Sequence, residues 1–147
     1  MLIDGPHLRA GYGPKENRHR PAIDPLFRTA ALSHGPRVVG VVLTGYLDDG
    51  TAGLNAIKTH GGVAVVQDPK DAAAPAMPES ALRNVQVDHC VPLAEMGSLL
   101  VRLAKRPAGR RNTKGAAPME KRSMSPKEME KKFGPPTAFV CPECNGP

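Results

Sequence analysis

The sequence predicts an α/β fold, a partial doubly wound (Rossmann-like) parallel sheet with flanking helices, followed by a disordered basic C-terminal tail. Two observations support this prediction. Short apolar runs alternate with segments of helical periodicity between residues 24 and 104. The run at 38–43 contains no polar residue, which suits a parallel strand with helices above and below it. Strands that alternate with helices over short connections form parallel sheets with crossover helices.

The first helix and the first strand are predicted from their boundary residues. The Asp24-Pro25 pair is typical of a helix start, because a carboxylate caps the first turn and Pro suits the first helical position. The Gly35-Pro36 pair is typical of a helix end. The apolar run 38–43 then predicts a strand buried on both faces. Residues 1–22 are rich in Gly, Pro and Arg and show no periodic signal.

The later elements continue the alternation. A second helix is predicted over about 51–60 and a second strand over 63–67. A third helix begins near Met77, a third strand covers about 87–91, and a last helix follows Pro92. That helix has one apolar stripe, made of Leu93, Met96, Leu100 and Leu103. Three strands make a thin sheet for this design.

The charge distribution divides the chain into a neutral and a basic part. The formal net charge is +6, but residues 1–104 contain ten Lys and Arg against ten Asp and Glu, whereas residues 105–134 contain ten against three. We therefore expect a folded portion at 1–104, a basic Pro/Gly-rich linker at 105–136 and a truncated CxxC appendix at 137–147. The basic segment could contact nucleic acid through phosphates, but it has no interleaved aromatic residues, so a solvated linker is favoured.

The cysteines and the apolar content bound the compartment. The three cysteines are an odd number and no secretory signal precedes them, which favours a reducing, cytoplasmic setting. No apolar run approaches the ~20 residues needed to cross a bilayer. Cys141 and Cys144 form a CxxC pair, but a zinc site needs four ligands, so free thiols or half of a lost site are favoured over zinc. No cofactor is predicted.

Two adjacent carboxylates follow the first strand. Asp48 and Asp49 lie between the apolar run 38–43 and the helix predicted from about Thr51. They should therefore occupy a loop at the carboxyl end of a strand, where open α/β sheets place their chemistry. The alternative is that an Asp before a helix only caps its first turn.

Several motifs, in order, resemble one known family. The segments that carry the resemblance are Asn17 to Arg28 (NRHRPAIDPLFR), Val41 to Gly50 (VVLTGYLDDG), Val65 to Asp68 (VVQD) and Ala76 to Pro78 (AMP). They are similar to the HRPsvDxLFrS, GviLTGmgxDG, aQd and gMP elements of the protein-glutamate methylesterases of bacterial chemotaxis (the CheB type). The resemblance covers about residues 2–104.

The resemblance implies a carboxylic ester hydrolase that removes methyl groups from glutamate side chains on the cytoplasmic domain of chemoreceptors. Members use a Ser-His-Asp triad on a doubly wound domain, and the triad aspartate falls on Asp49. Its role would be to orient the imidazole and stabilise the imidazolium. Asp48 occupies a variable position and is interpreted as a loop or cap residue. Tyr46 and Leu47 stand where the family usually has Met-Gly, and Ala76 replaces a usual Gly.

The serine and histidine of the triad have no counterpart in this sequence. In the family both precede the region matched here, so we expect that Met1 lies inside a longer ancestral domain. None of the five serines lies in a strand-to-helix elbow, and His19, within the HRP motif, is not at the base's position. His19 could border the site, although a solvated basic segment is favoured. The Met77-Pro78 turn is interpreted as structural.

Two functional hypotheses follow from these residues. The first is a methylesterase-type domain that is incomplete as given. The second is a non-catalytic interaction fragment that binds receptor tails or a partner chain, because the loss of neighbouring strands leaves a sheet edge unpaired and prone to self-association.

Overall fold

The structure is a computed structural model that describes residues 1–10 and 15–107. Its elements are β1 (Leu2–Asp4), β2 (His7–Arg9), α1 (Ile23–His34), a 3₁₀ turn (Gly35–Arg37), β3 (Val39–Val42), α2 (Thr51–Thr59), β4 (Val63–Gln67), α3 (Ala76–Asn84), β5 (His89–Val91) and α4 (Leu93–Ala104). The predicted alternation of helices and strands is confirmed, and β4 has the predicted bounds. The predicted linker lies outside the described residues except for positions 105–107, and the predicted CxxC appendix lies outside them entirely.

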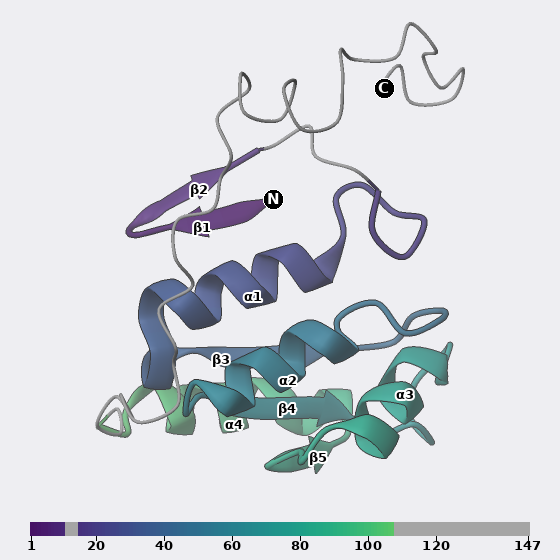
Figure 1. Ribbon diagram of the computed structural model, residues 1–147. Coiled ribbons are helices and arrows are strands. Elements are labelled where there is room, and N and C mark those ends of the chain that lie inside the picture. The colour runs from purple at the N-terminus through teal and green to yellow at the C-terminus, as the bar shows by residue number, and fades with distance from the viewer. Residues whose placement is uncertain (11–14, 108–147) are drawn as a thin grey trace, which may run out of the picture. The chain divides into compact units, whose positions relative to one another are not determined.

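The central sheet is parallel, as predicted, with the strand order β3-β4-β5. Val39 pairs with Val63 in the first ladder, and Val65 pairs with His89 in the second. The strand arrows in Figure 1 therefore point the same way, and all three carboxyl ends meet at one edge of the sheet. The loops that follow β3 and β4 both emerge at that edge.

Helices cover the sheet on both faces, and the side chains of the strands alternate between them. Val42, Ala64 and Val66 belong to a core with α1, α2 and α3, whereas Val65 belongs to a second core with α4. Figure 1 shows α2 in front of the sheet and α4 behind it. The second core is smaller, and Val39 and Val41 of β3 are only half-buried there. The prediction that the first strand is buried on both faces was therefore only partly right.

Helices α1 and α2 approach each other closely at Gly53. A Cβ atom at this position would lie 2.5 Å from Cβ of Phe27 and 3.1 Å from Cα of Asp24. Only glycine leaves room for the two helix backbones at this crossing. The start of α2 is therefore held directly against the first turn of α1.

A short N-terminal hairpin, β1–β2, was not predicted. Its strands have three residues each and are mostly exposed, so they lack an apolar alternation that could reveal them. The hairpin is held to α1 by polar contacts. The N–H of Ile3 donates to Oγ1 of Thr29 at 2.9 Å, and Oγ of Ser33 donates to the carbonyl of Ile3 at 3.3 Å. Within the described ranges, no helix is long and apolar enough to span a bilayer.

Candidate active site

The two adjacent carboxylates lie in the loop between β3 and α2, at the carboxyl end of the sheet, as predicted. Their environments differ. Asp49 is 5% exposed, whereas Asp48 is exposed and contributes its main-chain carbonyl, which accepts from the N–H of Thr51 at 3.1 Å. Asp49 is therefore the carboxylate that points into the protein.

Asp49 is oriented by donors from the segment before α1 and from the first turn of that helix. Its Oδ2 accepts from the N–H of Ile23 at 2.9 Å. Its Oδ1 accepts from the N–H of Asp24 at 3.2 Å and from Nδ2 of Asn17 at 3.1 Å. Because the first N–H groups of a helix have no partner within the helix, Asp49 satisfies two of them in α1.

The carboxylate of Asp24 likewise accepts a main-chain N–H at the start of α2. Its side chain is also 5% exposed, and Oδ1 accepts from the N–H of Gly53, in the first turn of α2, at 2.6 Å. Its Oδ2 accepts from Nδ2 of Asn17 at 2.8 Å. The amide of Asn17 thus bridges the two carboxylates. Asp49, which precedes α2, caps α1, and Asp24, which belongs to α1, caps α2.

This exchange corrects the prediction for Asp24. The sequence predicted that Asp24 caps its own helix, but α1 begins at Ile23 with Ala22 at the N-cap, and no side chain of that residue makes a cap hydrogen bond. Asp24 is the second residue of α1, and its carboxylate reaches α2 instead. The alternative interpretation, in which Asp49 only caps the first turn of α2, is also wrong, because the hydrogen bonds of its carboxylate are to Asn17 and to the start of α1.

The positive ends of two helices compensate these buried carboxylates. An uncompensated buried charge is strongly unfavourable, whereas helix N-terminal N–H groups stabilise a nearby carboxylate. Asp49 is therefore a fixed acceptor in a defined orientation. A carboxylate held in this way can accept a hydrogen bond from an imidazole and stabilise its protonated form.

Gln67, at the end of β4, ties the site loop to the neighbouring loop. It is 3% exposed, and its Oε1 accepts from the N–H of Thr44 at 2.9 Å. Its Nε2 donates to Oδ2 of Asp71 at 2.9 Å, and the same oxygen accepts from the N–H of Leu93 at 2.8 Å. The hydrogen bonds from Leu93 and Gln67 hold the pKa of Asp71 below its ordinary value.

Gly45 and Met77 form a second tie between these loops. The N–H of Met77 donates to the carbonyl of Gly45 at 3.1 Å, and a Cβ at Gly45 would lie 2.2 Å from Sδ of Met77. Met77 and the buried Pro78 therefore shape the wall of the loop, which agrees with their structural interpretation.

The loop also contains a residue in a disfavoured conformation. Leu47 has φ = 66°, the left-handed region that suits glycine, and it stands where the related motif usually has Gly. Leu47 and its neighbour Tyr46 are 50% and 78% exposed. The loop therefore has a backbone conformation suited to glycine, but this chain has a leucine at that position, close in sequence to Asp49.

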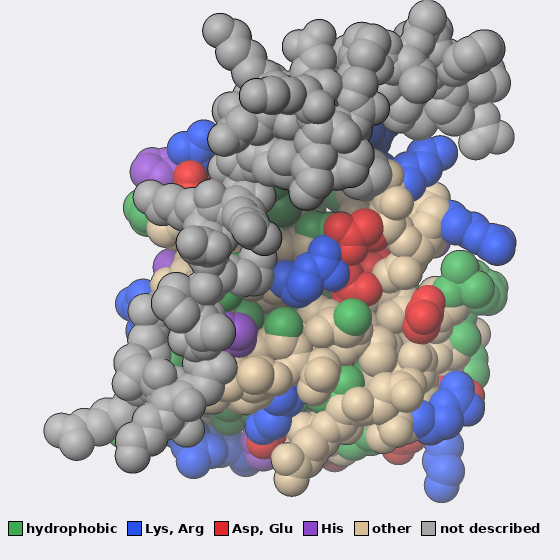
Figure 2. Space-filling view, in the orientation of Figure 1, with side chains coloured by type: hydrophobic (Ala, Val, Ile, Leu, Met, Phe, Trp, Pro, Cys, Tyr) green, Lys and Arg blue, Asp and Glu red, His purple; other side chains and the backbone are tan. Residues whose placement is uncertain are grey.

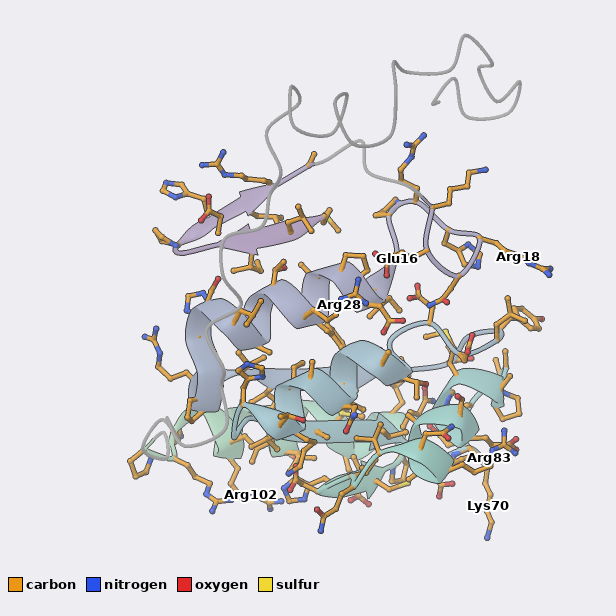
Figure 3. The ribbon with its side chains drawn as sticks, viewed as in Figure 1. Glu16, Arg18, Arg28, Lys70, Arg83 and Arg102 are labelled. Carbon is orange, nitrogen blue, oxygen red and sulfur yellow. The ribbon has the colours of Figure 1, made fainter. Side chains whose placement is uncertain are left out.

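A salt bridge lies on the surface near the carboxylates. Nη2 of Arg28 lies 2.6 Å from Oε2 of Glu16, and Figure 3 shows the two labelled side chains directed toward each other. In the space-filling view, acidic side chains gather in one patch beside basic ones (Figure 2). The segment before α1 is therefore attached to that helix both by Asn17 and by this ion pair.

The structure does not bring a histidine to Asp49. All five histidines lie within residues 1–10 and 15–107, and none of them hydrogen-bonds that carboxylate there. His19 is exposed, and its main chain pairs with Glu16. Ser33, Ser80 and Ser98 lie on helices, and Oγ of Ser80 accepts from Oγ1 of Thr51 at 3.0 Å. Ser123 and Ser125 fall outside the described residues.

Other reactive or ligating groups do not form a second centre. No group of three or more His, Cys, Asp or Glu within residues 1–10 and 15–107 could hold a metal ion. Partial burial and the nearby Asp68 raise the pKa of the Cys90 thiol, which disfavours the thiolate. Cys141 and Cys144 lie outside the described part, so their metal-binding capacity stays a prediction.

Sequence reasoning missed Asn17 and the second role of Asp24. Both lie in the segment that carries the HRP motif, so the motif itself was the available signal. The distance in sequence explains the omission, because Asn17 and Asp24 contact residues 32 and 29 positions away.

Comparisons with known proteins place these residues in a family context. A family model described as CheB methylesterase matches residues 1–100. A relative from Leptospira interrogans is 44% identical over 91 residues, which cover 62% of this chain and 47% of the relative. The protein-glutamate methylesterase/protein-glutamine glutaminase of Pyrococcus abyssi is 43% identical over 89 residues, which cover 60% of this chain and 24% of that protein.

The structural comparison agrees. The crystal structure of the Thermotoga maritima CheB methylesterase catalytic domain matches with a TM-score of 0.61 and 30% identity, over 62% of this chain and 48% of that domain. The chain thus spans about half the length, or less, of the proteins it matches. The resemblance that the motifs predicted is confirmed.

Proposed function

Because this chain belongs to the CheB methylesterase family, we propose that it carries the aspartate-bearing part of a protein-glutamate methylesterase. In this proposal, Asp49 orients the imidazole of a Ser-His-Asp triad during hydrolysis of glutamate methyl esters. The reaction adds water across the ester bond, giving a glutamate carboxylate and methanol. The substrate is the methylated cytoplasmic domain of a chemoreceptor, and the protein acts in the cytoplasm.

The observation that supports this role most strongly is the orientation of Asp49. Its carboxylate is buried at the carboxyl edge of a parallel sheet and is held by Asn17 and by two main-chain N–H groups of α1. Orientation is the main contribution of a triad aspartate, because it selects the tautomer and position of the imidazole. Asp48, its exposed neighbour, has no such constraint.

The same geometry implies that the 147-residue chain has little esterase activity by itself. Within the described residues no histidine hydrogen-bonds Asp49, and the serine that lines the neighbouring pocket, Ser80, has its hydroxyl paired with Thr51 rather than with an imidazole. The purified chain should release no more methanol from methylated receptor than buffer does. Turnover comparable to that of a full-length family member would show that the triad is complete within this sequence.

A chimeric enzyme tests the role of Asp49 directly. The part of the Thermotoga maritima catalytic domain that matches this chain would be replaced by residues 1–100, and methanol release measured on methylated receptor. We expect an active chimera, in which Asp49→Asn lowers kcat by about 10⁴, as with other triad aspartates. The matched control is Asp48→Asn, which should change kcat only a few-fold. Equal losses in the two variants would contradict the proposal.

A second proposal concerns partners, and it rests on the outer edge of β3. The N–H of Val63 donates to the carbonyl of Val38 at 2.9 Å, so Val38, Gly40 and Val42 direct their main-chain groups toward β4. The N–H and C=O groups of Val39 and Val41 consequently point away from β4, and within the described residues no strand pairs with them.

This edge is short but carries no charged residue and no Pro, which are features that keep edge strands from pairing. We propose that the chain associates with another chain or a partner through this edge. Light scattering should then detect oligomers that Val41→Lys disperses and that the control Val101→Lys, on the exposed face of α4, leaves intact. A monodisperse wild-type monomer would contradict this second proposal.

A further inference from the structure

A groove of about 780 Å³ lies at the amino-terminal end of the sheet, opposite the carboxylates. It runs from the start of β3, past the starts of β4 and β5, beneath the last turns of α4. Neither the family motifs nor Asp49 involves this region. Figure 3 shows Arg102 of α4 at this end of the molecule and Lys70 at the other.

The groove has an apolar floor. Val39 of β3, Val63 of β4 and Leu100 of α4 line it and are half-buried, and Leu103 lies beneath them at 7% exposure. Aliphatic groups that remain partly exposed in a concave surface favour a ligand that covers them with apolar atoms. The lining contains no Phe, Tyr or Trp, and its one imidazole belongs to the half-buried His89.

The rim of the groove is cationic. Arg37 and Arg106 line it and are exposed, and within residues 1–10 and 15–107 neither guanidinium takes part in an ion pair, although Nη2 of Arg37 lies 3.1 Å from Nδ1 of His34. Lys58 also lines the groove, but its Nζ lies 2.6 Å from Oδ1 of Asp88, which neutralises it. The net excess is therefore two arginines, which can each bind a carboxylate with both nitrogens of the fork.

From these features we propose that the groove binds an acidic, amphipathic peptide segment of a partner protein. Its apolar side chains would cover Val39, Val63 and Leu100, and its carboxylates would pair with Arg37 and Arg106. The chain's own C-terminal segment is a poor occupant, because residues 108–147 contain eight Lys and Arg against four Glu. Like charges on the segment and the rim would repel each other.

The composition of the groove also disfavours other polyanions. Single-stranded nucleic acids bind through platforms of several aromatic side chains, whereas this lining has no Phe, Tyr or Trp and a single half-buried imidazole, that of His89. Anionic membranes bind flat clusters of several basic residues, whereas here two arginines flank a concave aliphatic floor. A peptide satisfies both the aliphatic floor and the two separated cations.

The test uses the full 147-residue chain and a fluorescein-labelled peptide of about 12 residues, roughly 18 Å long as a helix, with Glu and Leu at helical spacing. Fluorescence anisotropy should show binding in the micromolar range. The double reversal Arg37→Glu/Arg106→Glu should weaken binding by about tenfold or more. The matched control is Lys70→Glu, which makes the same kind of charge reversal at the other end of the sheet and should change affinity less than about twofold. Far-UV circular dichroism would verify that each variant is folded.

Several outcomes would overturn the proposal. Absence of binding by the wild-type chain is one, and equal weakening by Lys70→Glu is another, since it would reveal only a general electrostatic effect. A control peptide with Gln in place of each Leu must bind at least about tenfold more weakly, because otherwise the apolar floor is not used. Binding of a DNA duplex or of phosphatidylserine vesicles with the same dependence on Arg37 and Arg106 would assign the groove to a different class of partner.

Discussion

Helices α1, α2 and α3 cover the face of the sheet beside Asp49, whereas α4 is the one helix that covers the other face within residues 1–10 and 15–107. On the first face, buried carboxylates cross between α1 and α2, and Gly53 allows close backbone contact. On the second face, the core consists of a few aliphatic residues, and a groove remains open beneath the end of α4. Gly97, within α4, has open space around it, since a Cβ atom there would meet no atom within 4 Å.

The contrast indicates where this sequence tolerates change. The first face depends on specific hydrogen bonds and on a close fit between backbones, so single atoms matter there. The second depends on aliphatic burial, which is non-directional and tolerates substitution more easily. If this comparison is right, equivalent substitutions on the two faces should differ in size and even in sign.

The largest difference is expected for the carboxylates. Asp49→Ala removes the acceptor of two main-chain N–H groups and of the Asn17 amide, and should lower the free energy of unfolding by about 3 kcal/mol. The control is Glu95→Ala, in the exposed first turn of α4, with an expected loss of about 0.5 kcal/mol. Urea denaturation of the full chain measures both. Similar losses would remove the distinction between the faces.

The next largest difference concerns two helical glycines. Gly53→Ala places a methyl group 2.5 Å from Cβ of Phe27 and should destabilise the protein by about 2 kcal/mol. Gly97→Ala meets nothing within 4 Å and should stabilise α4 by up to about 1 kcal/mol through helix propensity. Opposite shifts in the urea midpoint are expected. A stable Gly53→Ala variant would show that the α1–α2 contact can relax.

A smaller effect is expected in the loop that carries Asp49. Leu47→Gly relieves the left-handed strain at φ = 66°, which is worth about 1 kcal/mol, although added freedom in the unfolded chain offsets part of it. We expect a net gain of about 0.5 kcal/mol. Tyr46→Gly is the control, because Tyr46 is also exposed to solvent but has no left-handed φ, and it should lower stability. Thermal unfolding would reveal the two signs.

An equally small effect, confined to acid pH, is expected at the Lys58–Asp88 pair on the border of the groove. Partial burial acts to raise the pKa of Asp88, but the Lys58 ammonium and the N–H of Ala64 outweigh it, so this pKa is lowered from 3.8. The stabilisation is therefore present above that ordinary value and is lost as the pH falls through the lower, folded-state pKa.

Lys58→Met should reduce this acid-dependent loss by about 0.5 kcal/mol, since the pair is partly exposed. Urea unfolding at neutral pH and at several values below 3.8 would measure it. Arg83→Met, which removes a more exposed pair with Glu79, should leave the pH dependence unchanged. An identical dependence for wild type and Lys58→Met would refute the assignment.

Much of the fold could be predicted because its signals are local. The apolar runs at 38–43, 63–67 and 87–91, the helical periodicity between them and the Gly and Pro boundaries were sufficient to predict the parallel strands and the helices. The hairpin β1–β2 could not be predicted in this way, because strands of three exposed residues have no hydrophobic pattern. The half-burial of Val39 and Val41 in β3 also could not be predicted, because it depends on which helices pack against that face of the sheet.

The candidate site was predictable in position but not in contacts. Asp49 was identified from the motif and from its place after a strand, and its role in catalysis stays a prediction. Its partners come from Asn17 and the first turn of α1, and those are long-range contacts without a periodic signal. The helix starts were predicted to within two residues, but their capping partners were not. The reason is that α1, α2 and α4 receive side-chain acceptors from other elements rather than from their own N-cap residues.

The exchange of Asp24 and Asp49 between two helices has a consequence for how the protein opens. Opening the first turn of α1 breaks its hydrogen bonds to Asp49, and opening the first turn of α2 breaks its hydrogen bond to Asp24. The starts of the two helices therefore form one cooperative unit. Hydrogen–deuterium exchange would register this as a shared protection factor for the amides of Ile23, Asp24 and Gly53. A substitution of either aspartate is therefore expected to destabilise the other helix as well: Asp49 acts on the start of α1, and Asp24 acts on the start of α2.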